Sequence, residues 1–201
     1  MLEKGSIGID VNSDIGDVDW KKAADSIDFA MVRVSIGYYE TDPKFFERVN
    51  AIHDAKIPLG LYLVENTRNS AGATDEGDFC RYSVLNELSF KPELPIFLRF
   101  SFGMSAHESL LLWDPKKSLK QYDMFILDLQ DEYETGICAD LDFAIENLDV
   151  DNLYEKVNGN FWLDDDFAET VPFSMRNLTN SMPLLGKNYP GIIMTTNQYK
   201  K

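Results

Sequence analysis

The strongest constraint in this sequence is the regular alternation of short apolar segments with helical patterns over its first 100 residues. Four apolar segments predict strands at 6–11, 29–34, 59–64 and 95–102. Helical patterns lie between them, at 19–24, 42–55 and 73–88. The predicted strands are apolar throughout, which is typical of parallel strands covered on both faces. The alternation predicts an α/β fold of parallel β/α units and leaves open a barrel or a doubly wound sheet.

Residues at the predicted helix starts support these boundaries. Asp19 suits the N-cap of the first helix, and Asp42 with Pro43 suits the start of the second, because a side-chain oxygen there accepts an amide hydrogen bond. No glycine-rich phosphate loop follows the first strand, which argues against a dinucleotide-binding fold.

Beyond residue 102 the pattern is less regular. An apolar segment at 124–129 predicts a strand, and 189–195 predicts a final one. Helices are expected over 140–157 and 174–185. We therefore divide the chain into three segments: residues 1–102 with the four β/α units, residues 103–165 as an insertion, and residues 166–201 with the last helix and strand.

Charge and composition exclude several classes of function. The 201 residues carry a formal net charge of −15, which disfavours binding to nucleic acid or to anionic membranes. No apolar run approaches the roughly 20 residues of a membrane span, and the first residues do not resemble a signal peptide. We expect cytoplasmic synthesis, so an extracellular role would need release by lysis or carriage on a phage-like particle.

Cys80 and Cys138 are expected as reduced thiols, and no metal or cofactor is implied.

Several segments, in order and spacing, resemble glycoside hydrolase family 25, the Chalaropsis-type lysozymes or N-acetylmuramidases. They are Gly8-Ile9-Asp10-Val11 with 16–20, then 29–33, 41–45, 57–62 and 92–98. Segment 188–195 resembles the fifth strand of that family, after a long insertion. The resemblance implies a β/α barrel, incomplete or rebuilt in its C-terminal half. It also implies binding of peptidoglycan glycan at the carboxyl ends of the strands.

The same resemblance places the catalytic acids at the ends of the first and fourth strands. Asp10 matches the first acid, but the family's D-x-E falls on Arg99-Phe100-Ser101. Arginine holds its proton above about pH 12, and a serine hydroxyl cannot replace a general acid. Asp10 is therefore a remnant of a catalytic pair, and we expect it to form a salt bridge with Arg99 that closes the cleft.

Other residues remain candidates for the site. Asp128, in a segment that superficially resembles a D-x-E strand, is a displaced acid candidate, although Gln130 stands where the glutamate should be. Tyr62, Arg99, Ser101 and Arg33 are candidate substrate contacts, with Arg33 also expected to pair with an internal acid. For other side chains we expect a structural role. Trp20 is expected in the core, His53 and His107 have no nearby residues that would complete a catalytic triad, and residues 164–166 are expected to cap a turn or helix.

These sequence features are consistent with three functions. The first is an inactive lysozyme-like protein that binds peptidoglycan or serves as a structural part of a larger assembly. The second is an active muramidase that uses Asp10 with Asp128 or Asp131. The third is an interaction module whose acidic segment, 128–169, binds a basic protein partner.

Overall fold

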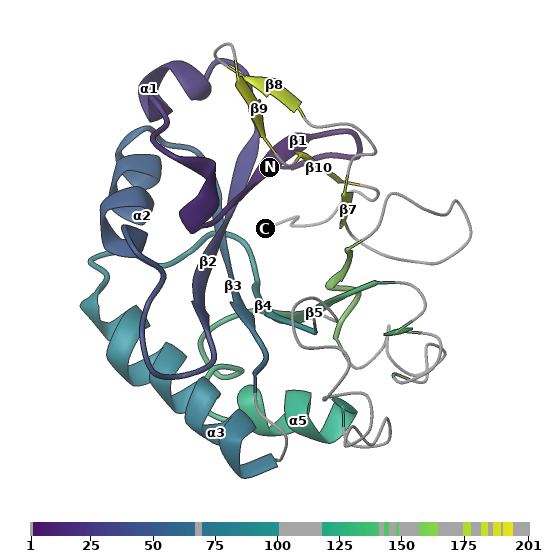
Figure 1. Cartoon of the computed structure of the whole chain (residues 1–201). Helices are drawn as coiled ribbons and strands as arrows, with labels where there is room; N and C mark the ends of the chain where they lie inside the picture. Colours follow the sequence, from purple (N-terminus) through teal and green to yellow (C-terminus); the bar gives the residue numbers. More distant parts are fainter. Residues whose placement is uncertain are drawn as a thin grey trace.

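The computed structural model describes residues 2–66, 70–100, 118–140, 143–144, 148, 157–164, 175–177, 182–184, 187–189 and 191–194. Within these residues the strands close into a barrel, in the order β1-β10-β7-β6-β5-β4-β3-β2 (Figure 1). Each of the three segments defined from the sequence contributes strands to this ring.

The ring is parallel except for one strand. The parallel strands are β1 (Ile7–Val11), β2 (Phe29–Ile36), β3 (Leu59–Val64), β4 (Ile96–Arg99), β5 (Thr135–Ala139), β6 (Phe161–Leu163) and β7 (Met175–Asn177). The last strand, β10 (Gly191–Met194), lies antiparallel between β7 and β1 and closes the ring. A separate two-stranded sheet is formed by β8 (Met182–Leu184) and β9 (Lys187–Tyr189).

Helices cover the outside of the first strands. They are α1 (Trp20–Ala23), α2 (Phe45–Asp54), α3 (Ser70–Asp78) and α5 (Ser118–Phe125). Short 3₁₀ helices lie at Ser13–Ile15 and Leu85–Glu87, and a π-helix at Phe79–Val84 continues α3. Figure 1 shows α1, α2 and α3 along one flank, with α5 beside α3. A backbone carbonyl of Phe125 lies 2.3 Å from where a Cβ on Gly77 would be, so glycine permits the close approach of α3 and α5.

Side chains alternate between two apolar layers. Ile9 and Val11 belong to the larger layer between strands and helices, whereas Phe29, Met31, Phe97 and Trp162 fill the inside of the ring. Inside, large side chains lie against glycines: a Cβ on Gly8 would lie 2.5 Å from the Phe29 ring. The pairs Met31 with Gly60 and Phe97 with Gly136 repeat this arrangement. The barrel interior is thus filled by side chains, as in other small barrels.

The first four predicted strands and the first helix are confirmed. Asp19 caps α1 by accepting a hydrogen bond from the Lys22 amide at 3.3 Å. The prediction that Asp42 caps the second helix is wrong. Lys44, with a left-handed φ of 65°, precedes α2, and the Asp42 carboxylate instead binds Arg33.

Two predictions in the second half are wrong. Segment 124–129 is the end of α5 and a turn, because its buried residues follow a helical spacing at Tyr122, Phe125 and Leu129 while Leu127 is exposed. Strands β7 and β8 lie in 174–185, where a helix was predicted. The helix predicted over 140–157 lies mostly outside the described residues, although 143–144 are helical.

The final predicted strand is present but has a different place from the one the resemblance implied. Segment 191–194 is β10, which pairs with β1, whereas β5 occupies the fifth position beside β4. The overall architecture is an α/β fold in which a mixed, curled sheet carries helices on its outside.

The packing of Gly8 against Phe29 gives a first prediction. Gly8→Ala should lower the free energy of unfolding by about 1–3 kcal/mol, because the new methyl group overlaps the phenyl ring. The same change should cost less in a Phe29→Leu background, where the ring is absent. Urea unfolding of the four proteins measures this coupling, and equal costs in both backgrounds would contradict it.

Candidate functional site

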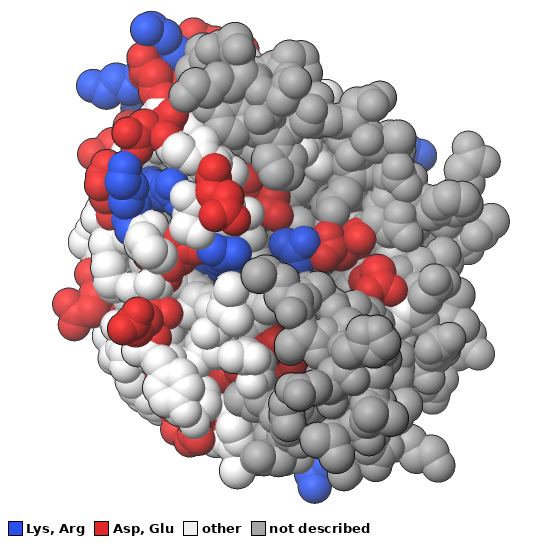
Figure 2. All heavy atoms as spheres, viewed as in Figure 1, with Lys and Arg blue, Asp and Glu red and all other residues white. Residues whose placement is uncertain are grey.

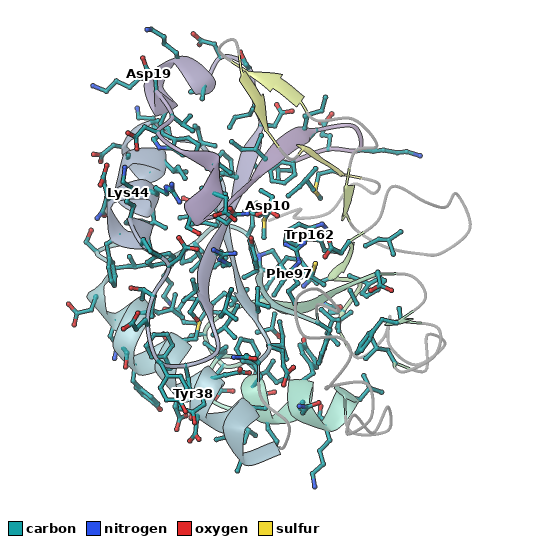
Figure 3. The ribbon with its side chains drawn as sticks, in the orientation of Figure 1. Asp10, Asp19, Tyr38, Lys44, Phe97 and Trp162 are labelled. Carbon is teal, nitrogen blue, oxygen red and sulfur yellow. The ribbon has the colours of Figure 1, made fainter. Side chains whose placement is uncertain are left out.

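The candidate site lies at the carboxyl ends of the parallel strands. Asp10 on β1, Tyr62 on β3 and Arg99 on β4 meet there, together with Asp164, which directly follows β6. Parallel strands bring their carboxyl ends to one edge of a barrel, which is why residues so distant in sequence are neighbours. Figure 3 shows Asp10, Phe97 and Trp162 close together in the middle of the ring.

Arg99 joins two carboxylates across this edge. Its Nε and Nη2 donate to the two oxygens of Asp164 at 2.8 and 2.7 Å. Its Nη1 donates to Oδ2 of Asp10 at 3.0 Å, so the salt bridge predicted from the sequence is present. Bidentate arginine–carboxylate pairs are the stronger class of charge-assisted hydrogen bond. One cation therefore links the ends of β1, β4 and β6.

Tyr62 occupies the other oxygen of Asp10. Its hydroxyl donates to Oδ1 at 2.6 Å, and its side chain is only 1% exposed. Tyr62 was predicted as a sugar contact, but its ring is buried and its hydroxyl already has a partner. Both oxygens of Asp10 are thus hydrogen-bonded within the protein.

Aromatic rings surround the guanidinium. Its Cζ lies 5.3 Å from the centroid of the Tyr62 ring and 5.4 Å from that of Trp162. Trp162 in turn packs edge-on against Tyr62 and Phe97, with centroids 5.5 and 5.8 Å apart. Cation–π attraction at these distances adds to the ion pairs and restricts the orientation of Arg99.

The protonation of the group follows from burial and pairing. Burial raises the pKa of Asp10 above its ordinary value, and Arg99 and Tyr62 offset part of this rise. Burial lowers the pKa of Arg99, but Cys138, Asp10 and Asp164 more than compensate, so it stays well above the usual range. Arg99 is therefore a permanent cation and cannot act as a proton donor.

Arg33 has an internal acid partner, as expected. Its Nε donates to Oδ2 of Asp42 at 2.6 Å, and its Nη2 donates to the Ser13 hydroxyl at 2.7 Å. The Ser13 amide donates to the same carboxylate oxygen at 3.2 Å. This network fixes the turns that follow β1 and β2, and it occupies the guanidinium that was a candidate substrate contact.

Asp128 is not brought to this group. It lies in the turn between α5 and β5, which connects a helix to the amino end of a strand, on the edge opposite Asp10. There it hydrogen-bonds Asp78, which raises the pKa of Asp78. Glu132, in the same segment, pairs with Arg81 and Lys91. Ser101 and His107 lie outside the described residues.

Other aromatic side chains lie away from this group. Trp20 is in the core, as expected, and the exposed His53 stacks on Phe90 with ring centroids 3.8 Å apart, in agreement with the surface or packing role expected for it. Tyr38 and Tyr39 follow β2 as an aromatic pair with ring centroids 4.3 Å apart; Tyr38 is half-buried and Tyr39 is 77% exposed. Figure 3 shows Tyr38 apart from Asp10, toward α3.

Sequence reasoning missed Trp162 and did not place Asp164 in the site. The sequence signal for this site was a short apolar segment, Phe161-Trp162-Leu163, followed by an aspartate, which resembles the apolar first strand that carries Asp10 near its end.

Within the described part of the chain, no group of three or more metal-binding side chains is present. Nor does any helix there have the length and apolar character to cross a membrane.

Removing the cation should destabilise the barrel strongly. Arg99→Met leaves the buried Asp10 and the half-buried Asp164 without their cation, and we expect a loss of about 3 kcal/mol in the free energy of unfolding at neutral pH, toward the lower end of the range for buried pairs. The loss should shrink as the pH falls, because protonated carboxyls need no cation.

Urea unfolding of Arg99→Met between pH 4 and 7 measures this loss. Lys91→Met, which removes an exposed partner of Glu132, is the matched control and should change stability by less than about 1 kcal/mol. Similar losses in the two variants would contradict a clamping role for Arg99.

Comparison with known proteins gives structural matches alone. No protein-family model matches the sequence, and no curated protein matches it. A family 25 glycosyl hydrolase from Bacillus anthracis matches with a TM-score of 0.77 at 16% identity, over 97% of this chain and 91% of that one. The autolysin LytC from Streptococcus pneumoniae matches with a TM-score of 0.78 at 17% identity, over 94% of this chain and 46% of LytC.

A bacterial lysozyme from Streptomyces coelicolor matches with a TM-score of 0.69 at 15% identity, over 96% of this chain and 93% of that one. Sequence identity this low establishes shared architecture rather than shared chemistry. The resemblance first seen in the strand segments is thus confirmed at the level of structure, and the chain has the fold of the family 25 lysozymes.

Proposed function

We propose that this protein is a catalytically inactive member of the lysozyme-fold proteins and acts as a peptidoglycan-binding module. The observation that carries the proposal is the guanidinium of Arg99, which lies between Asp10 and Asp164 where the strands end.

Hydrolysis of a glycosidic bond needs a carboxylic acid to protonate the leaving oxygen and a second carboxylate on the other side. Arg99 bonds Asp10 at 3.0 Å and Asp164 at 2.7 Å, which leaves no space for a sugar between these two carboxylates. Asp10 also accepts from Tyr62, so both of its oxygens already have partners within the protein. Loss of a general acid alone costs about 10²–10⁴ in rate.

Structural neighbours support a glycan ligand. LytC is described in complex with a synthetic peptidoglycan ligand, and its lysozyme-like part has the same architecture as this chain. On this protein, the exposed ring of Tyr39 and the half-buried ring of Tyr38 lie together on the turn after β2. Tyrosine offers an apolar face and a hydroxyl together, which suits the mixed surface of a sugar. We assign the glycan contact to this pair rather than to the filled interior.

A second candidate is a structural role in a larger assembly, such as a phage-like particle that reaches the cell wall. The net charge of −15 favours contact with a basic protein partner. Figure 2 shows acidic side chains spread over the described part of one face, with basic ones among them. Binding that weakens steeply with added salt, without binding to cell walls, would favour this candidate.

The direct test of the proposed inactivity is an assay of peptidoglycan hydrolysis. We expect purified protein to release no reducing ends from labelled peptidoglycan but to sediment with cell walls, while a known lysozyme under the same conditions releases them. Asp10→Asn is the internal control. Release by the native protein that Asp10→Asn abolishes would overturn the proposal and require a displaced acid.

The glycan contact has its own test. Replacing both Tyr38 and Tyr39 with serine should weaken cell-wall binding about tenfold, because two stacking faces are lost. Tyr82→Ser is the matched control, since Tyr82 is 54% exposed but lies beside Asp128 on another part of the surface. Sedimentation at several wall concentrations measures the affinities. Equal weakening by Tyr82→Ser would argue against a specific contact.

A further inference from the structure

Glu76 is a buried carboxyl that the proposed function does not use. It lies on α3 with no exposed surface. Its Oε1 accepts a hydrogen bond from the Asn66 amide at 2.9 Å, just beyond the end of β3. Its Oε2 is buried and has no hydrogen-bond partner. Buried polar atoms nearly always have a partner, so an unpaired carboxyl oxygen needs an explanation.

In the part of the chain that the structure describes, the groups around Glu76 are neutral or acidic. Glu65 faces it from the end of β3, and Asp75 faces it from the same helix. The turn after β2 contributes Gly37 next to Oε1, and Tyr38 beside it. From α5 comes Gln121, whose amide donates to Glu65 at 2.9 Å. Among the described residues, no lysine or arginine forms an ion pair with Glu76.

Burying a carboxylate in these surroundings costs more free energy than burying a neutral carboxylic acid. Burial raises the pKa of Glu76 to about 8, and the nearby charges of Glu65 and Asp75 add to the rise. In the neutral form one oxygen still accepts from Asn66, and the other carries the proton. The side chain then resembles a glutamine in shape and charge.

We propose that Glu76 is a proton-dependent latch: its neutral carboxyl stays buried and ties the end of β3 to α3, and its ionised carboxylate leaves this position and releases the strand end. The latch adds a regulatory property to the fold and does not depend on whether the protein binds glycan.

The strand end held by the latch also borders the candidate site. The Glu65 amide donates to the Arg99 carbonyl at 2.9 Å, and the Gly37 amide donates to the Val64 carbonyl at 3.0 Å. The turn that carries Tyr38 and the strand that carries Arg99 are thus both attached to the segment that Glu76 holds. Release of this segment loosens the rim of the barrel on this side.

The sign of the pH dependence follows from the two states. An unfolded glutamate titrates near 4.5, whereas folded Glu76 titrates at about 8. Between these values the folded state binds more protons than the unfolded state. The stabilisation from this proton is full below about pH 4.5 and is lost as the pH rises through about 8. Each pH unit in this window lowers the folding equilibrium constant by up to about tenfold.

Glu76→Gln isolates this effect, because the amide keeps the shape and hydrogen bonding of the neutral acid but cannot ionise. We expect the native protein and Glu76→Gln to have similar stability at pH 5. The native protein should become progressively less stable than the variant up to about pH 8.5. The protection of the Asn66 amide against hydrogen exchange, corrected for the intrinsic rate, should fall over the same range only in the native protein.

Glu65→Gln is the second variant. It removes a neighbouring negative charge that raises the pKa of Glu76 but keeps Glu76 itself, so the transition should persist and move to lower pH. A stability difference between the native protein and Glu76→Gln that is constant from pH 5 to 8.5 would overturn the proposal. So would equal loss of Asn66 protection in both proteins.

Discussion

The ion pairs of Arg99 are the interaction on which this edge of the barrel depends. One guanidinium joins β1, β4 and β6 through Asp10 and Asp164, and aromatic rings from β3 and β6 hold it in place. These strands are not all neighbours in the ring, so the contact acts across the opening rather than along the sheet. Without the cation, the buried Asp10 and the half-buried Asp164 would repel each other, and the cation would be costly to place there without them.

The edge at which the strands end carries a charge-balanced group. Carboxylates that are kept apart and reactive at an active site cost stability. Here Asp10 and Asp164 are joined through Arg99, and the interior below them is packed by large side chains against Gly8, Gly60 and Gly136. This edge of the barrel is therefore held by bonds within the protein.

Local sequence patterns predicted the elements that depend on nearby residues. The first four strands and the cap at Asp19 are of this kind, since a strand or cap is set by a few consecutive side chains. The apolar segment at 124–129 was misread because burial at Tyr122, Phe125 and Leu129 follows a helical period that a short window hides. The salt bridge between Asp10 and Arg99 was predictable once the ends of two parallel strands were matched. Its third member, Asp164, was not, because the position of β6 in the ring is a tertiary property.

The antiparallel closing strand has a consequence for how the chain folds. β10 completes the ring by pairing Ile7 with Ile193, so the first and last strands of the ring meet across nearly the whole sequence. Contacts between such distant residues carry a large loop-closure cost and tend to slow folding. During synthesis, the edge of β1 that pairs with β10 therefore stays exposed until residues 191–194 have been made. Until then the protein presents an unpaired strand edge, the feature by which partly folded chains most readily associate with one another.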